Sequence, residues 1–336
     1  MALRQKSWES LGSNLIRRSD KWQLFWRFYS SKKVDLRQLR SMIKKRVENR
    51  AKDYPVQGMI PVSKEVLSSR KLVIEGVSTL LKVFPVMACK FCPEVYIGEE
   101  GHLIQTCSGY KRRAKNLVHE WVVGGLNDII VPVESFHLRH MYQNVISHDQ
   151  RFDFDRVPAV LELCRQAGAD PNDESLYPST ANSDGNGGDV DGLDIVSPQE
   201  LRSLANGTLK AWETLRVGVQ KLMLVYPTKV CKYCSEVHIG PSGHRARNCG
   251  VFKYQSWRGT HFWKKAEVDD VVPPKIVWRR RPHDPPVLLD EGRDFYGHAP
   301  AVVDLCSKAG ALVPSKYNCM MKIEGLSRRP DLDKLI

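Results

Sequence analysis

The sequence that decides the fold is Val83-Phe84-Pro85 followed by Cys89-Lys90-Phe91-Cys92, because it returns as Val225-Tyr226-Pro227 and Cys231-Lys232-Tyr233-Cys234. The offset is 142 residues in each case, and it also relates four further segments. These pairs are Gly101-His102 with Gly243-His244, Cys107 with Cys249, His119 with His261, and Pro158-Ala159-Val160 with Pro300-Ala301-Val302. A shared offset over many segments indicates a tandem duplication without a net gap between the copies.

The duplication sets the domain organisation that we predict. Between the copies, Gln166 to Leu201 contains eight acidic residues and no Lys or Arg, which favours a flexible acidic linker. The predicted parts are a transit peptide (1–29), a basic N-terminal segment (30–71), a first repeat (72–169), an acidic linker with a lead-in helix (170–213), a second repeat (214–311) and a C-terminal tail (312–336).

Within each copy, apolar spacing predicts a small α+β unit. Helical spacing runs from Leu72 to Val83, from Leu215 to Val225 and from Val157 to Ala167, where Gly168 can end the helix. Short strands are expected at Val95–Gly98, Trp121–Val123 and Asp128–Val131.

Charge and composition narrow the function classes. The chain of 336 residues carries a formal charge of +13, which points to an acidic partner such as nucleic acid or an anionic membrane surface. No apolar run is long enough for a spanning helix, so we expect no membrane insertion. The basic, acid-poor start with Arg27-Phe28-Tyr29-Ser30-Ser31 is typical of a mitochondrial presequence, with the chloroplast as the alternative.

Each copy contains the spacing Cys-x2-Cys-x9-His-x4-Cys, a donor set typical of closed, structural zinc sites. We therefore predict two structural Zn²⁺ ions, held by Cys89, Cys92, His102 and Cys107, and by Cys231, Cys234, His244 and Cys249. Alternatives are an iron–sulfur cluster and incidentally buried cysteines. Cys164 and Cys306 are expected in the core. We interpret His119 and His261 as hydrogen-bonded core residues, with a role beside the metal or in RNA contact as alternatives.

Basic and aromatic residues interleave near these motifs. Lys and Arg can neutralise phosphates and aromatic rings can stack on bases, so we predict RNA contacts, although charged runs are also typical of solvated surfaces. The candidate contacts are Lys90, Phe91, Lys111, Arg112, Arg113, Lys115, Lys232, Tyr233, Lys253, Arg258, Lys264, Lys265, Arg279, Arg280 and Arg281. RNA is favoured over duplex DNA because no recognition helix or Cys2His2 finger is evident.

The duplicated cysteine motif, together with the closing Pro-Ala-Val-x-x-Leu-Cys-x-x-Ala-Gly-Ala at 158–169 and 300–311, resembles the plant APO ("accumulation of photosystem one") family. This resemblance implies a non-catalytic RNA-binding protein of chloroplasts or mitochondria. It implies binding to intron-containing transcripts, help in splicing group II introns alongside other splicing factors, and zinc in each repeat. The RNA target and the oligomeric state do not follow from the sequence.

Two other function classes compete with this interpretation. One is a metal-dependent RNA-processing enzyme, in which Glu94 or Glu236 would act with His119 or His261 as an acid–base pair. The other is an iron–sulfur protein acting in complex assembly.

Overall fold

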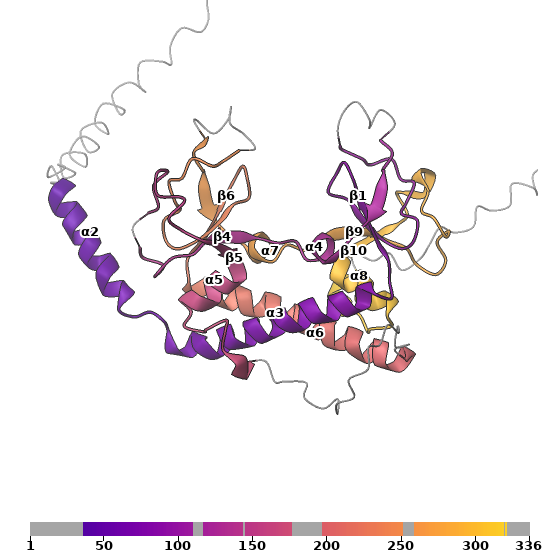
Figure 1. Cartoon of the computed structure of the whole chain (residues 1–336), viewed down its shortest axis with the longest axis horizontal. Coiled ribbons are helices and arrows are strands. Elements are labelled where there is room, and N and C mark those ends of the chain that lie inside the picture. Colours follow the sequence, from indigo (N-terminus) through magenta and orange to yellow (C-terminus); the bar gives the residue numbers. More distant parts are fainter. Residues whose placement is uncertain are drawn as a thin grey trace, which may run out of the picture. The chain divides into compact units, whose positions relative to one another are not determined.

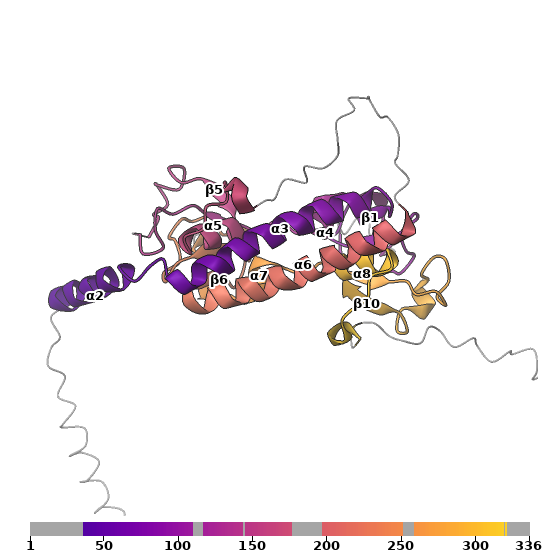
Figure 2. The same cartoon turned by 90° about the horizontal axis from the view of Figure 1, so that it is seen from below.

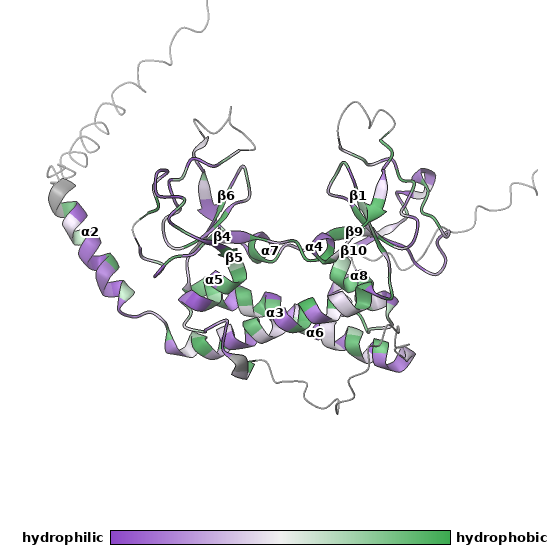
Figure 3. Cartoon of the chain, in the orientation of Figure 1, coloured by the Kyte–Doolittle hydropathy of each residue, from purple (hydrophilic) through white to green (hydrophobic). Residues whose placement is uncertain are grey.

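The computed structural model describes residues 36–109, 117–143, 145–176, 197–250, 259–318 and 320. The chain divides into two compact units, Met1–Asp53 and Tyr54–Ile336. In the first unit the described residues form a helix, α2 (Leu36–Ala51), which is mostly hydrophilic along its length (Figure 3). The predicted transit peptide lies outside the described residues.

Two long helices run side by side through the second unit (Figures 1 and 2). After the short turn η1 (Gln57–Met59), α3 spans Ile60–Leu81 and has a proline in its first turn; α6 spans Pro198–Val225. Ser197 caps α6 by accepting the Glu200 N–H at 3.3 Å, while the Glu200 carboxylate accepts the Ser197 N–H at 2.9 Å. Helix α3 begins well before the predicted segment, with a proline in its first turn, and the predicted lead-in helix before the second repeat forms the N-terminal part of α6, which Ser197 caps.

Glycines allow the two helices to approach closely at two points that the duplication relates. A Cβ atom at Gly76 would overlap Thr208 on α6, and a Cβ atom at Gly218 would overlap Val66 on α3. Each helix therefore presents its glycine to the other, and the two contacts are equivalent under the 142-residue offset.

Each copy contributes a three-stranded antiparallel sheet that contains the cysteines. The first has the order β2-β1-β3, from β1 (Val86–Cys89), β2 (Val95–Ile97) and β3 (Trp121–Val123). The second has the order β7-β6-β8, from β6 (Thr228–Cys231), β7 (Val237–Ile239) and β8 (Trp263–Lys265). The strands predicted at Val95–Gly98 and Trp121–Val123 are confirmed.

A short helix replaces the strand that we predicted at Asp128–Val131. Residues Leu126–Ile129 form α4, and Val268–Val271 form α7 at the equivalent place. The Asp128 carboxylate accepts the N–H of Gly125 at 2.8 Å, and this cap turns the chain into a helix. The strand prediction is wrong because the aliphatic run was too short to separate a helical turn from a strand.

A hairpin and a helix complete each copy. The first copy has β4 (Glu134–Phe136), β5 (Arg156–Pro158), α5 (Ala159–Gln166) and η2 (Glu174–Leu176). The second has β9 (Ile276–Arg279), η4 (Asp290–Gly292), β10 (Gly297–Pro300), α8 (Ala301–Lys308) and η5 (Ser315–Tyr317). The helix predicted at Val157–Ala167 is confirmed as α5, and Gly168 follows it with φ 88°.

The copies exchange these last parts. Strand β4 and helix α5 of the first copy pack against β7 of the second, while β9 and α8 of the second pack against β2 of the first (Figure 1). The connecting segments meet in an antiparallel bridge between Ile130 and Pro274. One core cluster contains residues of both copies, so the two α+β repeats fold as an intertwined pair.

The predicted linker is ordered at both ends. Ala167 and Ala169 are buried in the core, and Pro198–Leu201 form the first turn of α6. Residues 177–196 lie outside the described part of the chain. None of the described helices is long and apolar enough to cross a membrane.

Candidate metal centres

Three cysteines of each copy converge at the end of its central strand. Cys89 ends β1, Cys92 lies in the following turn, and Cys107 returns on the loop between β2 and β3. The Sγ atoms of Cys89 and Cys107 are 3.9 Å apart, and those of Cys231 and Cys249 are 4.0 Å apart. All eight described cysteines are free thiols. The predicted grouping of the six motif cysteines therefore matches their geometry.

A histidine completes each group, and it is His119 in the first copy and His261 in the second. The His119 Nδ1 atom lies 3.5 Å from Cys92 Sγ, and the His261 Nδ1 atom lies 3.3 Å from Cys234 Sγ. A tetrahedral zinc site has edges of about 3.8 Å between two sulfurs and about 3.5 Å between sulfur and nitrogen. The measured distances fit these edges, so the donor atoms present suit a tetrahedral Cys3His site.

His102 and His244, which we predicted as the fourth ligands, are not part of the cysteine groups. Nδ1 of His102 accepts the Ile104 N–H at 3.1 Å, which leaves Nε2 to donate to Glu94 at 2.9 Å. Nδ1 of His244 accepts the Ala246 N–H at 3.2 Å, and its Nε2 atom bonds Glu236 at 3.1 Å. Both ring nitrogens are thus used, and no lone pair remains for a metal. The Cys3His group that the structure brings together has the spacing Cys-x2-Cys-x14-Cys-x11-His.

A tryptophan two residues after His119 and His261 holds the other histidine of each copy, His102 or His244, in place. Trp121 donates its Nε1–H to the backbone oxygen of His102 at 3.0 Å, and Trp263 does the same to His244. The indole of Trp121 also meets the His102 ring edge-on, with centroids 4.8 Å apart. The repeated His-x-Trp motif made His119 and His261 candidates, but Gly-His at 101–102 and 243–244 recurs equally strictly, so recurrence alone could not choose between the two histidines.

Polar partners contact the Nε2 side of His119, away from the cysteines. Thr106 Oγ1 lies 3.0 Å from His119 Nε2 and donates to the Glu94 carboxylate at 2.9 Å. Burial disfavours the charged form of Glu94, but hydrogen bonds from His102 and Thr106 outweigh it and lower the pKa to about 2. In the second copy Asn248, at the position of Thr106, contacts His261 Nε2. Such outer partners fix the ring orientation of a metal-binding histidine.

The sulfurs interact strongly with one another and with backbone groups. Burial opposes ionisation of Cys89, yet the Phe91 N–H and the His119 side chain lower its pKa to about 6. Burial and the thiols of Cys89 and Cys107 raise the pKa of Cys92 to about 12. Crowded thiols therefore resist a second ionisation, and a bound divalent cation would offset that repulsion.

Each centre is also supported by the other copy, as a consequence of the exchange. Trp278 of the second copy donates its Nε1–H to Glu94 Oε1 at 2.8 Å. Arg156 of the first copy donates to Glu236 Oε1 at 2.6 Å, which helps to lower the pKa of Glu236 to about 2 against the effect of burial. Glu94 and Glu236, the carboxylates beside the two candidate centres, thus each accept a hydrogen bond from a side chain of the other repeat.

The glutamates offer a second possible metal group in each copy. Glu94, His102 and His119 lie within 4.8 Å of one another, as do Glu236, His244 and His261. His119 and His261 belong to both kinds of group, and their Nδ1 atoms face sulfur. The two nitrogens of His102 are already bonded, so the cysteine group is the better candidate.

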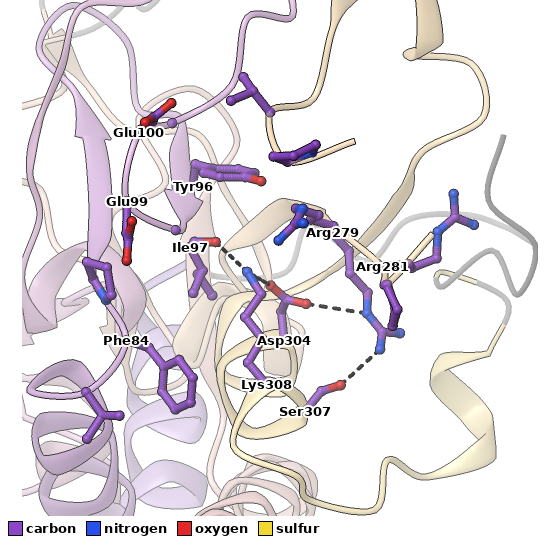
Figure 4. A pocket seen from close by; sticks show the side chains of 18 residues that line it. Phe84, Tyr96, Ile97, Glu99, Glu100, Arg279, Arg281, Asp304, Ser307 and Lys308 are labelled. Carbon is purple, nitrogen blue, oxygen red and sulfur yellow. Dashed lines mark hydrogen bonds and ion pairs between the residues drawn. The ribbon is translucent and has the colours of Figure 1, made fainter. Parts of the chain in front are cut away.

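The predicted RNA contacts fall into three classes. Lys111, Arg112, Arg113, Lys115, Lys253 and Arg258 lie outside the described residues. Lys90, Lys232, Lys264 and Lys265 are exposed, while Phe91 and Tyr233 are half-buried. The third class is the Arg279–Arg281 run, which borders a cavity of about 800 Å³ beside α8 (Figure 4).

The arginine run is largely structural. Arg281 is only 5% exposed and donates to Asp284 at 2.9 Å, so its predicted contact with RNA is wrong. Arg279 donates to Ser307 at 2.9 Å and pairs with the buried Asp304 at 3.4 Å (Figure 4). Arg280 remains exposed, with its Nε–H donated to the backbone oxygen of Pro285 at 3.0 Å.

The core prediction for the late cysteines is confirmed. Cys164 and Cys306 are fully buried in the shared core. Burial raises the pKa of the Cys306 thiol to about 12, and burial also raises the pKa of the Cys164 thiol. Both behave as small apolar side chains.

Comparison with known proteins identifies the family. The APO RNA-binding family profile matches residues 26–183 and 192–326. The chain is 36% identical over 331 residues to APO protein 2, chloroplastic, of Arabidopsis thaliana, covering 87% of this chain and 75% of that protein. It is 35% identical over 300 residues to APO protein 3, mitochondrial, of the same plant, covering 80% and 73%. No solved structure matches. The chain therefore belongs to the APO RNA-binding family.

Proposed function

We propose that this protein is a non-catalytic RNA-binding factor of an organelle, which promotes the splicing of group II introns and holds one structural zinc ion in each repeat. The observation that carries the proposal is the pair of closed Cys3His groups in a chain of an RNA-binding family. Four protein donors satisfy a tetrahedral zinc ion and leave no position for a reacting water.

The role of the metal would be to fix the loops that carry basic residues. Cys89 and Cys92 end a strand and start a turn, whereas Cys107 and His119 flank the stretch of sequence that contains Lys111 to Lys115. One ion would join all these segments, so that their cations are presented from a rigid base. Phosphate contacts of this kind give affinity that falls as salt rises.

Catalysis is disfavoured by the state of the acid–base candidates. Glu94 accepts hydrogen bonds from His102, Thr106 and Trp278, which hold its carboxylate ionised. A general base needs a free lone pair facing a substrate and a pKa near the working pH. We therefore propose that Glu94 and Glu236 position the metal-binding histidines. RNA cleavage by the purified protein that disappears in an E94Q/E236Q variant would contradict this.

The metal can be identified by elemental analysis of the purified chain. We expect two zinc ions per chain and a colourless protein. A brown protein with iron and sulfide would instead support the iron–sulfur alternative.

The splicing role is tested by RNA crosslinking in isolated organelles followed by sequencing of the bound transcripts. We expect group II introns to be enriched, and we expect plants that lack the protein to accumulate the same introns unspliced. Enrichment of mature coding RNA alone would contradict the role.

For the compartment we propose the mitochondrion, with the chloroplast as the alternative. The support is the Arg27-Phe28-Tyr29-Ser30-Ser31 sequence and the similarity to a mitochondrial relative as well as chloroplastic ones. Import assays with both isolated organelles, followed by sequencing of the new N-terminus, decide between them.

A further inference from the structure

The edge strands β3 and β8 occupy the same position in their sheets but carry different chemistry. Among the described strands, each pairs with the central strand alone, and the registers correspond: Met87 lies opposite Val123, and Lys229 lies opposite Lys265. The duplication therefore allows a position-by-position comparison of two surfaces. We use the name β3 face for the residues along the exposed edge of the first sheet, Met87, Lys90, Glu120, Val122 and Val123, and the name β8 face for their counterparts Lys229, Lys232, Phe262, Lys264 and Lys265. Side chains alternate along a strand, so Lys265 lies on the same side of its sheet as Lys229, and Lys264 lies on the other side of that edge.

The β3 face is apolar and electrically neutral. Val122 and Val123 are exposed, the latter by 85%. The one cation of this face, Lys90, forms an ion pair with Glu120 at 2.8 Å. No charge of the β3 face is left to hold a phosphate.

The β8 face carries four cations and an exposed ring. Phe262 replaces Glu120 and is 60% exposed. Lys264 and Lys265 replace the two valines, and both are exposed. Within the part of the chain that the structure describes, no acidic side chain pairs with Lys229, Lys232, Lys264 or Lys265.

Two of these cations face each other across the strands. Lys229 on β6 is directly opposite Lys265 on β8, and like charges in this arrangement destabilise a sheet. The equivalent pair in the first repeat is Met87 and Val123, which has no such cost. An anion bridging the two lysines would remove the repulsion, so the pair itself points to an anionic ligand.

An aromatic platform lies beside the cations. The rings of Phe262 and Tyr233 are 6.2 Å apart at 62°, and Lys232 Nζ lies 5.9 Å from the Tyr233 ring. Exposed rings next to a line of cations are the combination that binds single-stranded nucleic acid, through base stacking and phosphate neutralisation.

We propose that the β8 face of the second repeat binds a single RNA strand, whereas the β3 face makes no phosphate contact. A phosphate would lie between Lys229 and Lys265, and a base would stack on Phe262. The proposal rests on the proposed RNA-binding function and assigns that function unequally to the two repeats.

The test measures binding of the full-length protein to fluorescein-labelled oligouridylate over a range of salt concentrations. The variant K264V/K265V removes two cations from the second repeat by replacing them with valine, the residue at both equivalent positions of the first repeat. Losing two phosphate contacts is expected to weaken binding about ten-fold at 0.15 M salt and to make the log–log salt slope shallower by about 1.4. F262A is expected to weaken binding at least about five-fold with little change of slope.

A control and a gain variant complete the test. K210A/K221A removes the same charge from exposed positions of α6 and is expected to leave the slope nearly unchanged. V122K/V123K transfers the cations to the first repeat and is expected to steepen the slope by about 1.4. Metal content and circular dichroism establish that each variant is folded.

The outcomes separate this inference from the proposed function. If the wild-type protein does not bind RNA, the proposed function fails. The assignment to the β8 face is overturned if the wild type binds RNA and K264V/K265V binds it as tightly as the wild type. It is also overturned if K264V/K265V binds RNA no more weakly than the control K210A/K221A. In both cases the proposed RNA-binding function stands.

Discussion

Trp278→Phe is the most informative single substitution, because it tests whether one repeat supports the metal centre of the other. The indole of Trp278 donates to Glu94 at 2.8 Å, and Glu94 in turn accepts from Thr106, which contacts His119. Phenylalanine occupies the matched place in the first repeat, as Phe136, so the fold accommodates the smaller ring.

The expected effect follows from the number of bonds that remain. A hydrogen bond to a charged group contributes about 1.5–3 kcal/mol. Glu94 keeps its bonds from His102 and Thr106, so the lower value of about 1.5 kcal/mol applies, which is roughly a ten-fold loss of affinity at the first centre. The second centre, whose Glu236 is held by Arg156, is expected to be unchanged.

The assay must report the two centres separately. Zinc-loaded protein is titrated with a chelator and treated with iodoacetamide, and peptide mass spectrometry then measures alkylation of each cysteine. In the W278F variant, Cys89, Cys92 and Cys107 should become reactive at about ten-fold lower chelator concentration than Cys231, Cys234 and Cys249.

The reciprocal variant provides the matched control. Arg156→Gln removes the donor to Glu236 and should expose the second group of cysteines in preference to the first. If W278F weakened both centres equally, or only the second, the proposed support across the repeats would be refuted.

Three further predictions concern the ligands, the exchange and the helix contact. His119→Ala should reduce the metal content from two ions to one, whereas His102→Gln, which keeps a donor for Glu94, should retain both; elemental analysis that gave the reverse result would show the ligand assignment to be wrong. Proteolysis at a site introduced within 177–196 should leave the two fragments together in gel filtration, because they share one core, and separate elution would contradict the intertwined fold. Gly76→Ala should lower the free energy of unfolding by about 1–3 kcal/mol through overpacking, whereas Gly207→Ala, in the same helix pair with open space around it, should raise it by up to about 1 kcal/mol; denaturant titration should give these opposite signs.

The candidate centres were predicted in part from spacing alone. A cysteine pair two residues apart, followed by a third cysteine, restricts the thiols to one turn and one returning loop, and the duplication excluded coincidence. The choice between His102 and His119 depended on where each ring nitrogen finds its partner. Sheet pairing decided this: the register of Cys89 with Trp121 brings His119 to the thiols, while the backbone turn at Ile104 occupies His102.

For the long helices and the short helix α4, too, the sequence predicted part of the structure and contacts in the folded chain decided the rest. Apolar spacing located the C-terminal halves of α3 and α6, since amphipathic helices are visible in sequence. The start of α6 depended on the Ser197 cap, and α4 formed where the Asp128 carboxylate accepts the Gly125 N–H, which aliphatic residues alone do not reveal. Arg281 was misassigned because its burial depends on Asp284 and Phe295, which lie beyond the basic run.

The amino-acid sequence by itself determined that the chain is duplicated, that each copy is a small α+β unit and which cysteines gather. It could not determine which hairpin covers which sheet, because the two copies present nearly the same apolar faces and either pairing buries them. The tertiary structure decided this through the crossing near Ile130 and Pro274 and the close approach of α3 and α6, which direct each chain end onto the opposite repeat.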